Sequence, residues 1–279
     1  MILVTGAKGQ LGSDVSAELT KRSIPHIPTE ADTLDITDKA AVEKFFSDNS
    51  ISSVIHCAAY TAVDKAESEE ELCFKINAEG TENLAEASAK SNAKMLYVST
   101  DYVFQGDGDH PFEVYDKKNP QNIYGKSKLL GEEAVKKHSD KYFIVRTSWV
   151  FGEKNTNFIH TMLRLSETRD EVSVVCDQIG SPTYSKDLAR LLSDMIITEK
   201  YGEYHARNDG FCSWNELAEE TFRIAGKKVK VNPVKSEDYK TAAKRPLNSR
   251  LSMAAVKENG FTPLQHWKDA IREYLSNIL

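Results

Sequence analysis

The chain has 279 residues and a formal net charge of −6, with 36 Lys and Arg scattered among 42 Asp and Glu. This balance disfavours a nucleic-acid binder, which normally shows a basic stripe, and no apolar run approaches the ~20 residues that span a bilayer. The four cysteines lack C-x-x-C spacing and no signal-peptide pattern is present, so we expect a cytoplasmic protein with reduced cysteines.

The chain begins with a pattern typical of a nucleotide-binding unit. Residues 1–6 form an unbroken apolar run, as buried parallel strands do, and Gly6, Gly9 and Gly12 precede a predicted helix at 13–22. A helix N-terminus behind a glycine turn offers free N–H groups and a favourable dipole to a phosphate. The spacing is one residue longer at the front than the usual dinucleotide fingerprint, and a tight turn without a ligand is the alternative.

Strand-like and helix-like segments then alternate. Strands are expected at 24–27, 53–57, 94–99, 142–147 and 172–176, and helices near 38–47, 68–91, 124–138 and 157–166. This alternation predicts an α/β fold with a Rossmann-type doubly wound parallel sheet and ligands at the carboxyl ends of its strands.

Tyr124 and Lys128 are four residues apart on a predicted helix, so both side chains point the same way. A free phenol has a pKa near ~10, and a nearby cation favours its ionised form. The pair alone also fits an exposed helix face. After a glycine loop and the strand-end hydroxyls of Ser99 and Thr100, it indicates a hydride-transfer site.

The last third of the chain is less regular. Ser213 and Glu216 form a capping-box pattern that opens a helix to about residue 224. A short strand at 228–231, a loop at 241–251 and a terminal helix at 265–278 complete a smaller α+β lobe. We expect a dinucleotide-binding domain at 1–150, with a later contribution from about 183–206, and a C-terminal substrate-binding lobe made of 151–182 and 207–279.

Several strings in order carry a family resemblance. They lie at 58–67, 99–104, 122–128, 146–151, 177–183 and 245–251. With the glycine loop they resemble the extended short-chain dehydrogenase/reductase superfamily, and more narrowly the dTDP-4-dehydrorhamnose reductases. The resemblance implies NADPH-dependent reduction, with NADH tolerated, of the C4 ketone of dTDP-4-dehydro-6-deoxy-L-mannose to dTDP-L-rhamnose, the last step of dTDP-rhamnose synthesis for cell-surface polysaccharide.

The resemblance also implies residue roles. Thr100, Tyr124 and Lys128 would be catalytic, with Thr100 bonding the ketone oxygen, Tyr124 protonating it and Lys128 lowering the Tyr124 pKa. The expected cofactor contacts are Gly6, Lys8, Gly9, Gln10, Leu11, Gly12, Asp35, Ile36, Ala58, Ala59, Tyr60, Thr61, Ser99, Tyr124 and Lys128. The expected substrate contacts are Thr100, Asp101, Tyr102, Trp149 and Arg245. Plainer roles are open for three of them: Trp149 as a core aromatic, Asp35 as the cap of a turn and Arg245 as a surface cation.

Two other functions also fit the resemblance. One is a sugar-nucleotide epimerase or a reductase of a different sugar, and the other is an NADP-binding regulatory subunit like that of methionine adenosyltransferase. Related dehydratases carry Glu where this chain has Tyr102, which favours a reductase.

The cofactor preference rests on two charged residues. Glu30, at the end of the second strand, is the kind of acid that bonds the ribose of NADH, whereas Lys8 could reach the 2′-phosphate of NADPH or be a solvated lysine. We expect NADPH to be preferred. For metal, Asp14 is an acidic candidate but Lys186 would oppose a dication, so magnesium is not predicted. The substrate would be a small nucleotide sugar, and the protein a monomer or homodimer.

Overall fold

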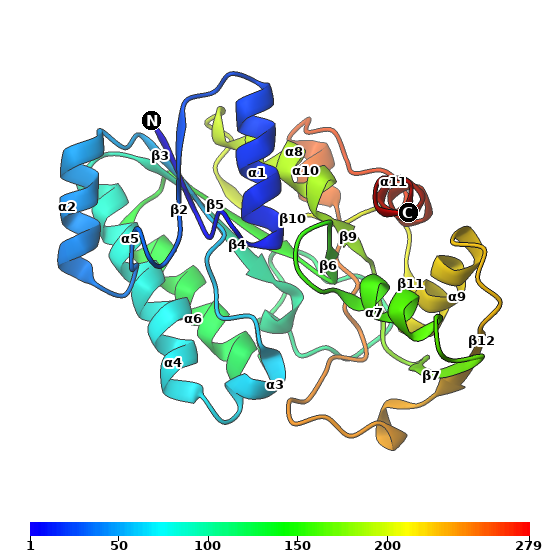
Figure 1. Ribbon diagram of the computed structural model, residues 1–279. Coiled ribbons are helices and arrows are strands. Elements are labelled where there is room, and N and C mark those ends of the chain that lie inside the picture. Colours follow the sequence, from blue (N-terminus) through cyan, green and yellow to red (C-terminus); the bar gives the residue numbers. More distant parts are fainter.

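A six-stranded parallel sheet organises the protein, whose computed structural model describes residues 1–279 (Figure 1). Its strand order is β10-β5-β4-β3-β1-β2. The strands are β1 (Ile2–Thr5), β2 (His26–Thr29), β3 (Ser53–His56), β4 (Lys94–Thr100), β5 (Tyr142–Thr147) and β10 (Gly202–His205). Every neighbouring pair is parallel. The predicted doubly wound α/β sheet is therefore confirmed, with β10 as an edge strand contributed late in the chain.

Helices cover both faces of this sheet (Figure 1). One face packs against α1 (Gln10–Lys21) and α8 (Ser185–Ile196), and the other against α2 (Lys39–Asn49), α5 (Gly80–Lys90) and α6 (Ile123–His138). The first core contains Val15, Leu19, Leu188 and Leu192, and the second is a separate apolar cluster around Leu3. Successive strand residues point to opposite faces, so the unbroken apolar run of β1 supplies both cores.

The helix predicted at 68–91 is broken into several pieces. The structure has α3 (Val63–Ala66), α4 (Glu70–Phe74), a π-helical turn (Lys75–Glu79) and α5. A π-turn inserts one extra residue into a helix and is frequent at functional sites. Here it turns the amide of Asn77, which is almost fully buried, away from the helix and toward neighbouring segments.

The strand predicted at 172–176 lies in the C-terminal lobe, in the part of the chain that the expected division assigns to that lobe. It is β7 (Glu171–Val175), which pairs in parallel with β12 (Lys230–Val234). The chain leaves the sheet after β5 and returns only at β10, so β7 packs against lobe helices instead. These are α7 (Phe158–Leu165) and α9 (Trp214–Ile224), whereas α11 (Trp267–Ile278) packs in a neighbouring apolar cluster of the lobe.

Short elements complete the lobe. They are β6 (Val150–Phe151), β8 (Ile179–Gly180), β9 (Thr183–Tyr184), β11 (Cys212–Ser213), a 3-10 turn (Ser236–Asp238) and α10 (Ala254–Glu258). The predicted capping box of α9 is present. None of the helices combines the length and apolar character that a membrane crossing requires.

Candidate active site

One cavity of about 750 Å³ opens at the carboxyl ends of the central strands and is bordered by the lobe. This volume is within the range of small-molecule sites. It is lined by Gly6, Gly9, Gln10, Leu11, Gly12, Asp35, Ile36, Ala58, Ala59, Thr61, Ser99, Thr100, Asp101, Tyr102, Tyr124, Lys128, Trp149 and Arg245. Of the residues predicted for the site, only Lys8 and Tyr60 are outside this lining. Segments that are far apart in the sequence therefore meet at one place.

The backbone of the glycine loop approaches itself so closely that Gly6 and Gly12 cannot be replaced by residues with a side chain. Gly6 has a φ of +66°, and a Cβ on Gly12 would be 2.1 Å from the Gly6 carbonyl oxygen. Helix α1 begins at Gln10 without a side-chain cap, so the N–H groups of its first turn have no partner in the helix. The loop therefore offers free donors and room for a diphosphate.

The contacts of Lys8 with residues beyond the end of β2 differ from its predicted role in binding the 2′-phosphate of NADPH. The Lys8 ammonium is 3.0 Å from Asp32 Oδ2, and both side chains are largely exposed. The Lys8 backbone N–H donates to the Glu30 carboxylate, and Glu30 lines the cavity. Lys8 is thus paired on the outer side of the loop, whereas Glu30 faces the cavity.

Asp35 lines the cavity and also caps a turn. Its carboxylate accepts hydrogen bonds from the Thr37 hydroxyl at 2.8 Å and the Thr37 N–H at 2.9 Å. These bonds lower the pKa of Asp35. The alternative role predicted for Asp35, as the cap of a turn, therefore agrees with these two hydrogen bonds.

Asn77, which sequence reasoning missed, holds the segment after β3. Its amide accepts from the Tyr60 N–H at 2.8 Å and donates to the Tyr60 carbonyl at 3.0 Å and to Ser127 Oγ at 3.0 Å. The Tyr60 ring points outward, where its hydroxyl donates to Glu69 at 2.6 Å. Poor helix formers at 77, 80 and 81, inside an otherwise helical stretch, were the available signal.

Helix α6 carries Tyr124 and Lys128 to the cavity. Its start is fixed by Asn122, whose side chain accepts from the Gly125 N–H at 2.8 Å. The Lys128 ammonium is 4.0 Å from the centre of the Tyr97 ring. Thr100, at the end of β4, donates its hydroxyl proton to Asp101 Oδ1 at 3.0 Å.

Burial dominates the electrostatics of this set. It raises the pKa of Tyr124 against the opposing influence of the hydrogen bond with Thr100, and lowers the pKa of Lys128 to about 7 against the attraction of Glu132. It also raises the pKa of Asp101 to about 6. The expected lowering of the Tyr124 pKa by Lys128 is therefore not found, because removal of the phenol from water is the largest influence on this pKa and raises it.

The lobe side of the cavity is aromatic and basic. The Trp149 ring stacks on Trp214 with centroids 3.8 Å apart, and a Cβ on Gly180 would be 2.9 Å from the Trp149 ring. Arg245 pairs with Asp64 at 2.6 Å and donates to the Tyr102 hydroxyl at 3.2 Å. Trp214 could not be predicted as part of the site, because nothing in the sequence shows that α9 faces residue 149.

Asp14 and Lys186, the two residues on which the metal prediction depends, have other partners. Asp14 accepts from the Ser185 hydroxyl at 2.5 Å, and the Lys186 ammonium is 2.5 Å from Glu153. No group of three or more His, Cys, Asp or Glu side chains is arranged to hold a metal ion. Whether the protein needs a metal stays a prediction.

Known proteins resemble the chain along its whole length. A family model described as the RmlD substrate binding domain matches residues 1–279. The dTDP-4-dehydrorhamnose reductase of Streptomyces griseus is 41% identical over 278 residues, which cover 97% of this chain and 91% of that protein. A crystal structure of a dTDP-4-dehydrorhamnose reductase from Clostridium acetobutylicum has 43% identity and a TM-score of 0.97, with 99% of each chain covered. The dTDP-4-dehydrorhamnose reductase of Bacillus anthracis, solved in complex with NADP, has 43% identity and a TM-score of 0.96 over 99% of this chain and 98% of that one.

Proposed function

The chain belongs to the dTDP-4-dehydrorhamnose reductase family, and we propose that it catalyses the NADPH-dependent reduction of the C4 ketone of dTDP-4-dehydro-6-deoxy-L-mannose to dTDP-L-rhamnose. The observation that carries the proposal is the meeting of a glycine loop, the Thr100–Tyr124–Lys128 set and an aromatic–basic wall in one cavity. This reaction is the last step of dTDP-rhamnose synthesis.

The residues present fit a dinucleotide. The cradle around Gly6 and Gly12, which a Cβ would fill, and the free N–H groups at the start of α1 suit a diphosphate. Asp35 and Ile36 would border the adenine, and Ala58, Ala59 and Thr61 the nicotinamide. Bound NADPH would supply the hydride.

Three side chains would act as negative charge develops on the ketone oxygen, two of them on that oxygen and the third on the cofactor. Thr100 would turn its hydroxyl from Asp101 toward that oxygen and stabilise the charge. Tyr124, whose raised pKa keeps it protonated, would give up its proton to the same oxygen. Lys128, on the next turn of α6, would hold the cofactor ribose and favour the phenolate that is left.

The lobe supplies the features that a nucleotide sugar needs. The stacked rings of Trp149 and Trp214 offer an apolar wall to the deoxysugar. Arg245 can bond a diphosphate through two N–H groups, and in the structure its charge is balanced by Asp64. Substrate diphosphate would compete with Asp64 for this guanidinium.

A turnover assay tests the proposal. Purified protein, NADPH and dTDP-4-dehydro-6-deoxy-L-mannose should give stoichiometric loss of NADPH and a product with the mass of dTDP-L-rhamnose. Boiled protein and protein without the sugar are the controls. Tight NADPH binding without any consumption would instead support a regulatory subunit, and conversion of the sugar without net loss of NADPH would support an epimerase.

A further inference from the structure

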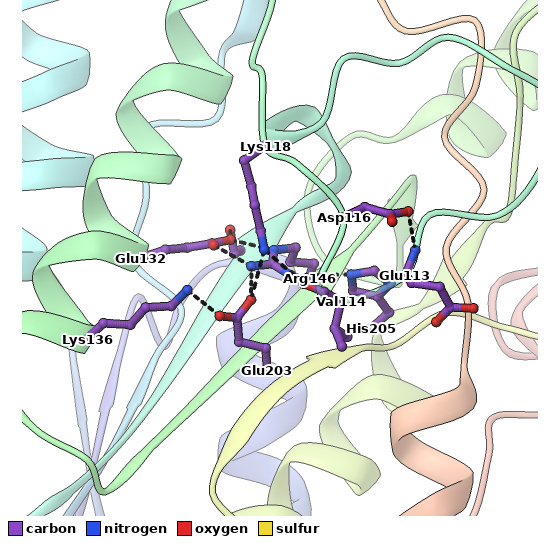
Figure 2. A network of polar contacts seen from close by, with 10 residues as sticks. Glu113, Val114, Asp116, Lys118, Glu132, Lys136, Arg146, Glu203 and His205 are labelled. Atoms are coloured by element: carbon purple, nitrogen blue, oxygen red, sulfur yellow. Dashed lines mark hydrogen bonds and ion pairs between the residues drawn. The ribbon is translucent and has the colours of Figure 1, made fainter.

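A network of charges joins helix α6 to strands β5 and β10 (Figure 2). Its centre is Arg146 on β5, a fully buried guanidinium. Arg146 donates to both oxygens of Glu132, with Nε–Oε1 at 2.7 Å and Nη2–Oε2 at 2.6 Å, and its Nη2 is also 2.5 Å from Glu203 Oε2. Glu203 pairs in turn with Lys118 at 3.4 Å and with Lys136.

The charges alternate in sign along this network. Glu132 lies on α6, Arg146 on β5 and Glu203 on β10, and Lys118 comes from the loop that precedes α6. The outer end of the network is partly exposed, whereas its inner end, Glu132, is almost completely buried. Such buried ions are tolerated only when each has partners.

The inner end of the network reaches the catalytic set. Tyr124, Lys128 and Glu132 are spaced by four residues on α6 and so share one face of the helix. Glu132 Oε1 also accepts from the Ser99 hydroxyl at 2.6 Å. Ser99 precedes Thr100 on β4 and lines the cavity. One carboxylate is thus bonded to the catalytic strand and lies one helical turn beyond Lys128.

We infer that Glu132, one helical turn from Lys128 on the same buried face of α6, keeps the Lys128 ammonium charged without forming an ion pair with it. Its importance in the reaction rests on the proposed function, but its effect on Lys128 does not. The charged or titratable groups that act on Lys128 are Glu132 from its own helix, Cys57 after β3 and Cys73 on α4, and the His56 imidazole also interacts with it. The Tyr97 ring covers the ammonium.

Among these groups, Glu132 alone is a carboxylate. Burial lowers the pKa of Lys128 to about 7, and Glu132 is the largest influence that raises it. A lysine with a pKa near neutrality changes charge under physiological conditions. Removal of the carboxylate would therefore leave Lys128 mostly neutral at pH 7.

Trace acetylation measures the charge of Lys128 directly, because only the neutral amine reacts. The acetylated fraction of the Lys128 peptide, followed by mass spectrometry against pH, gives a titration midpoint without substrate or cofactor. Glu132→Gln should lower this midpoint by roughly one pH unit, as loss of a nearby opposite charge does. Glu132→Asp keeps the charge and should stay near the wild type. Glu133→Gln, the exposed neighbour on α6, should leave the midpoint unchanged.

A second readout is the affinity for NADPH against pH, taken from cofactor fluorescence, which should weaken at lower pH in Glu132→Gln than in wild type. An unchanged Lys128 midpoint in folded Glu132→Gln would overturn the inference. If that variant does not fold, Glu132→Gln combined with Arg146→Gln, which removes both charges of the buried pair together, decides: a lowered midpoint supports the inference and an unchanged midpoint overturns it. Failure of the turnover assay would leave the acetylation result intact, so the two proposals can fail separately.

Discussion

Burial makes the Tyr124 phenol difficult to ionise, and this suits a group that must give a proton away. Tyr124→Phe should lower kcat by roughly 10²–10⁴-fold, as loss of a general acid does, while the dissociation constant for NADPH changes little. Steady-state kinetics and a cofactor titration measure the two effects. Tyr60→Phe is a matched control, since its hydroxyl bonds Glu69 outside the cavity. Wild-type turnover by Tyr124→Phe with the chemical step rate-limiting would contradict the mechanism.

Lys8 lies beside the glycine loop, but its ammonium is held by Asp32. If Lys8 turns to the 2′-phosphate of NADPH, Lys8→Ala should raise the KM for NADPH more than for NADH. Asp32→Asn is the complementary variant and should lower the KM for NADPH by releasing Lys8. The kcat/KM measured with NADPH and with NADH shows which cofactor each variant prefers. A higher value for NADH in the wild type would show that Glu30 controls the preference instead.

Asp101 should give the protein a recognisable pH dependence of stability. Its pKa is about 6 in the folded protein against an ordinary 3.8, so between these values the folded state binds more protons than the unfolded state. The contribution of Asp101 to the free energy of unfolding is therefore fully present below pH 3.8 and lost as pH rises through about 6.

Asp101→Asn removes this dependence. In urea unfolding, its free energy of unfolding relative to wild type should be more favourable at pH 7 than at pH 4.5. Comparing the two proteins at each pH cancels the other titrating groups. An identical difference at both pH values would mean that Asp101 does not titrate in this window.

At the scale of single elements, the start of α9 is the simplest to test. Ser213 accepts from the Glu216 N–H at 3.1 Å, and Glu216 accepts from the Ser213 N–H at 2.7 Å. Ser213→Ala should lower the free energy of unfolding by about 1 kcal/mol, measured by urea denaturation. Ser213→Asp can still cap the helix and should recover most of the loss. Equal destabilisation by both variants would point to a role of the hydroxyl other than capping.

Local patterns predicted most of the helices and strands, because apolar spacing, caps and glycine turns act over a few residues. They could not predict the π-turn at 75–79, since the partners of Asn77 are Tyr60 and Ser127, which are distant in sequence. They also could not identify the strand with which β7 pairs. A short β-branched run looks the same whether it pairs with β5 or with β12.

In the candidate active site, too, sequence patterns could predict only features that are formed by residues close together in the chain. The glycine loop and the Tyr124–Lys128 spacing are local and could be predicted, and the cavity contains both. The stacking of Trp149 on Trp214 and the network around Arg146, which includes the Lys118–Glu203 pair, join residues separated by up to about 85 positions. Only the packing of the whole molecule brings such residues together.

At the scale of the whole molecule, we propose the division into a cofactor domain of 1–150 with 183–206 and a substrate lobe of 151–182 and 207–279. Residues 1–150 lack α8, which covers α1, and the edge strand β10. A fragment 1–150 should therefore expose the apolar side of α1, bind hydrophobic dyes and lose NADPH affinity. Cooperative two-state urea unfolding of this fragment would contradict the interleaved arrangement. The oligomeric state, monomer or homodimer, stays a prediction.

The late arrival of β10 has a consequence for synthesis on the ribosome. Domains usually fold as units while the chain emerges, N-terminal part first. Here the sheet is complete only after residue 205 has left the exit tunnel, since β10 is its last strand. Until α8 has emerged, Val15 and Leu19 have no covering helix, and the nascent chain presents an apolar surface of the kind that chaperones bind. Translation of the lobe segment before α8 thus sets the minimum time for which the first half of the chain must be protected.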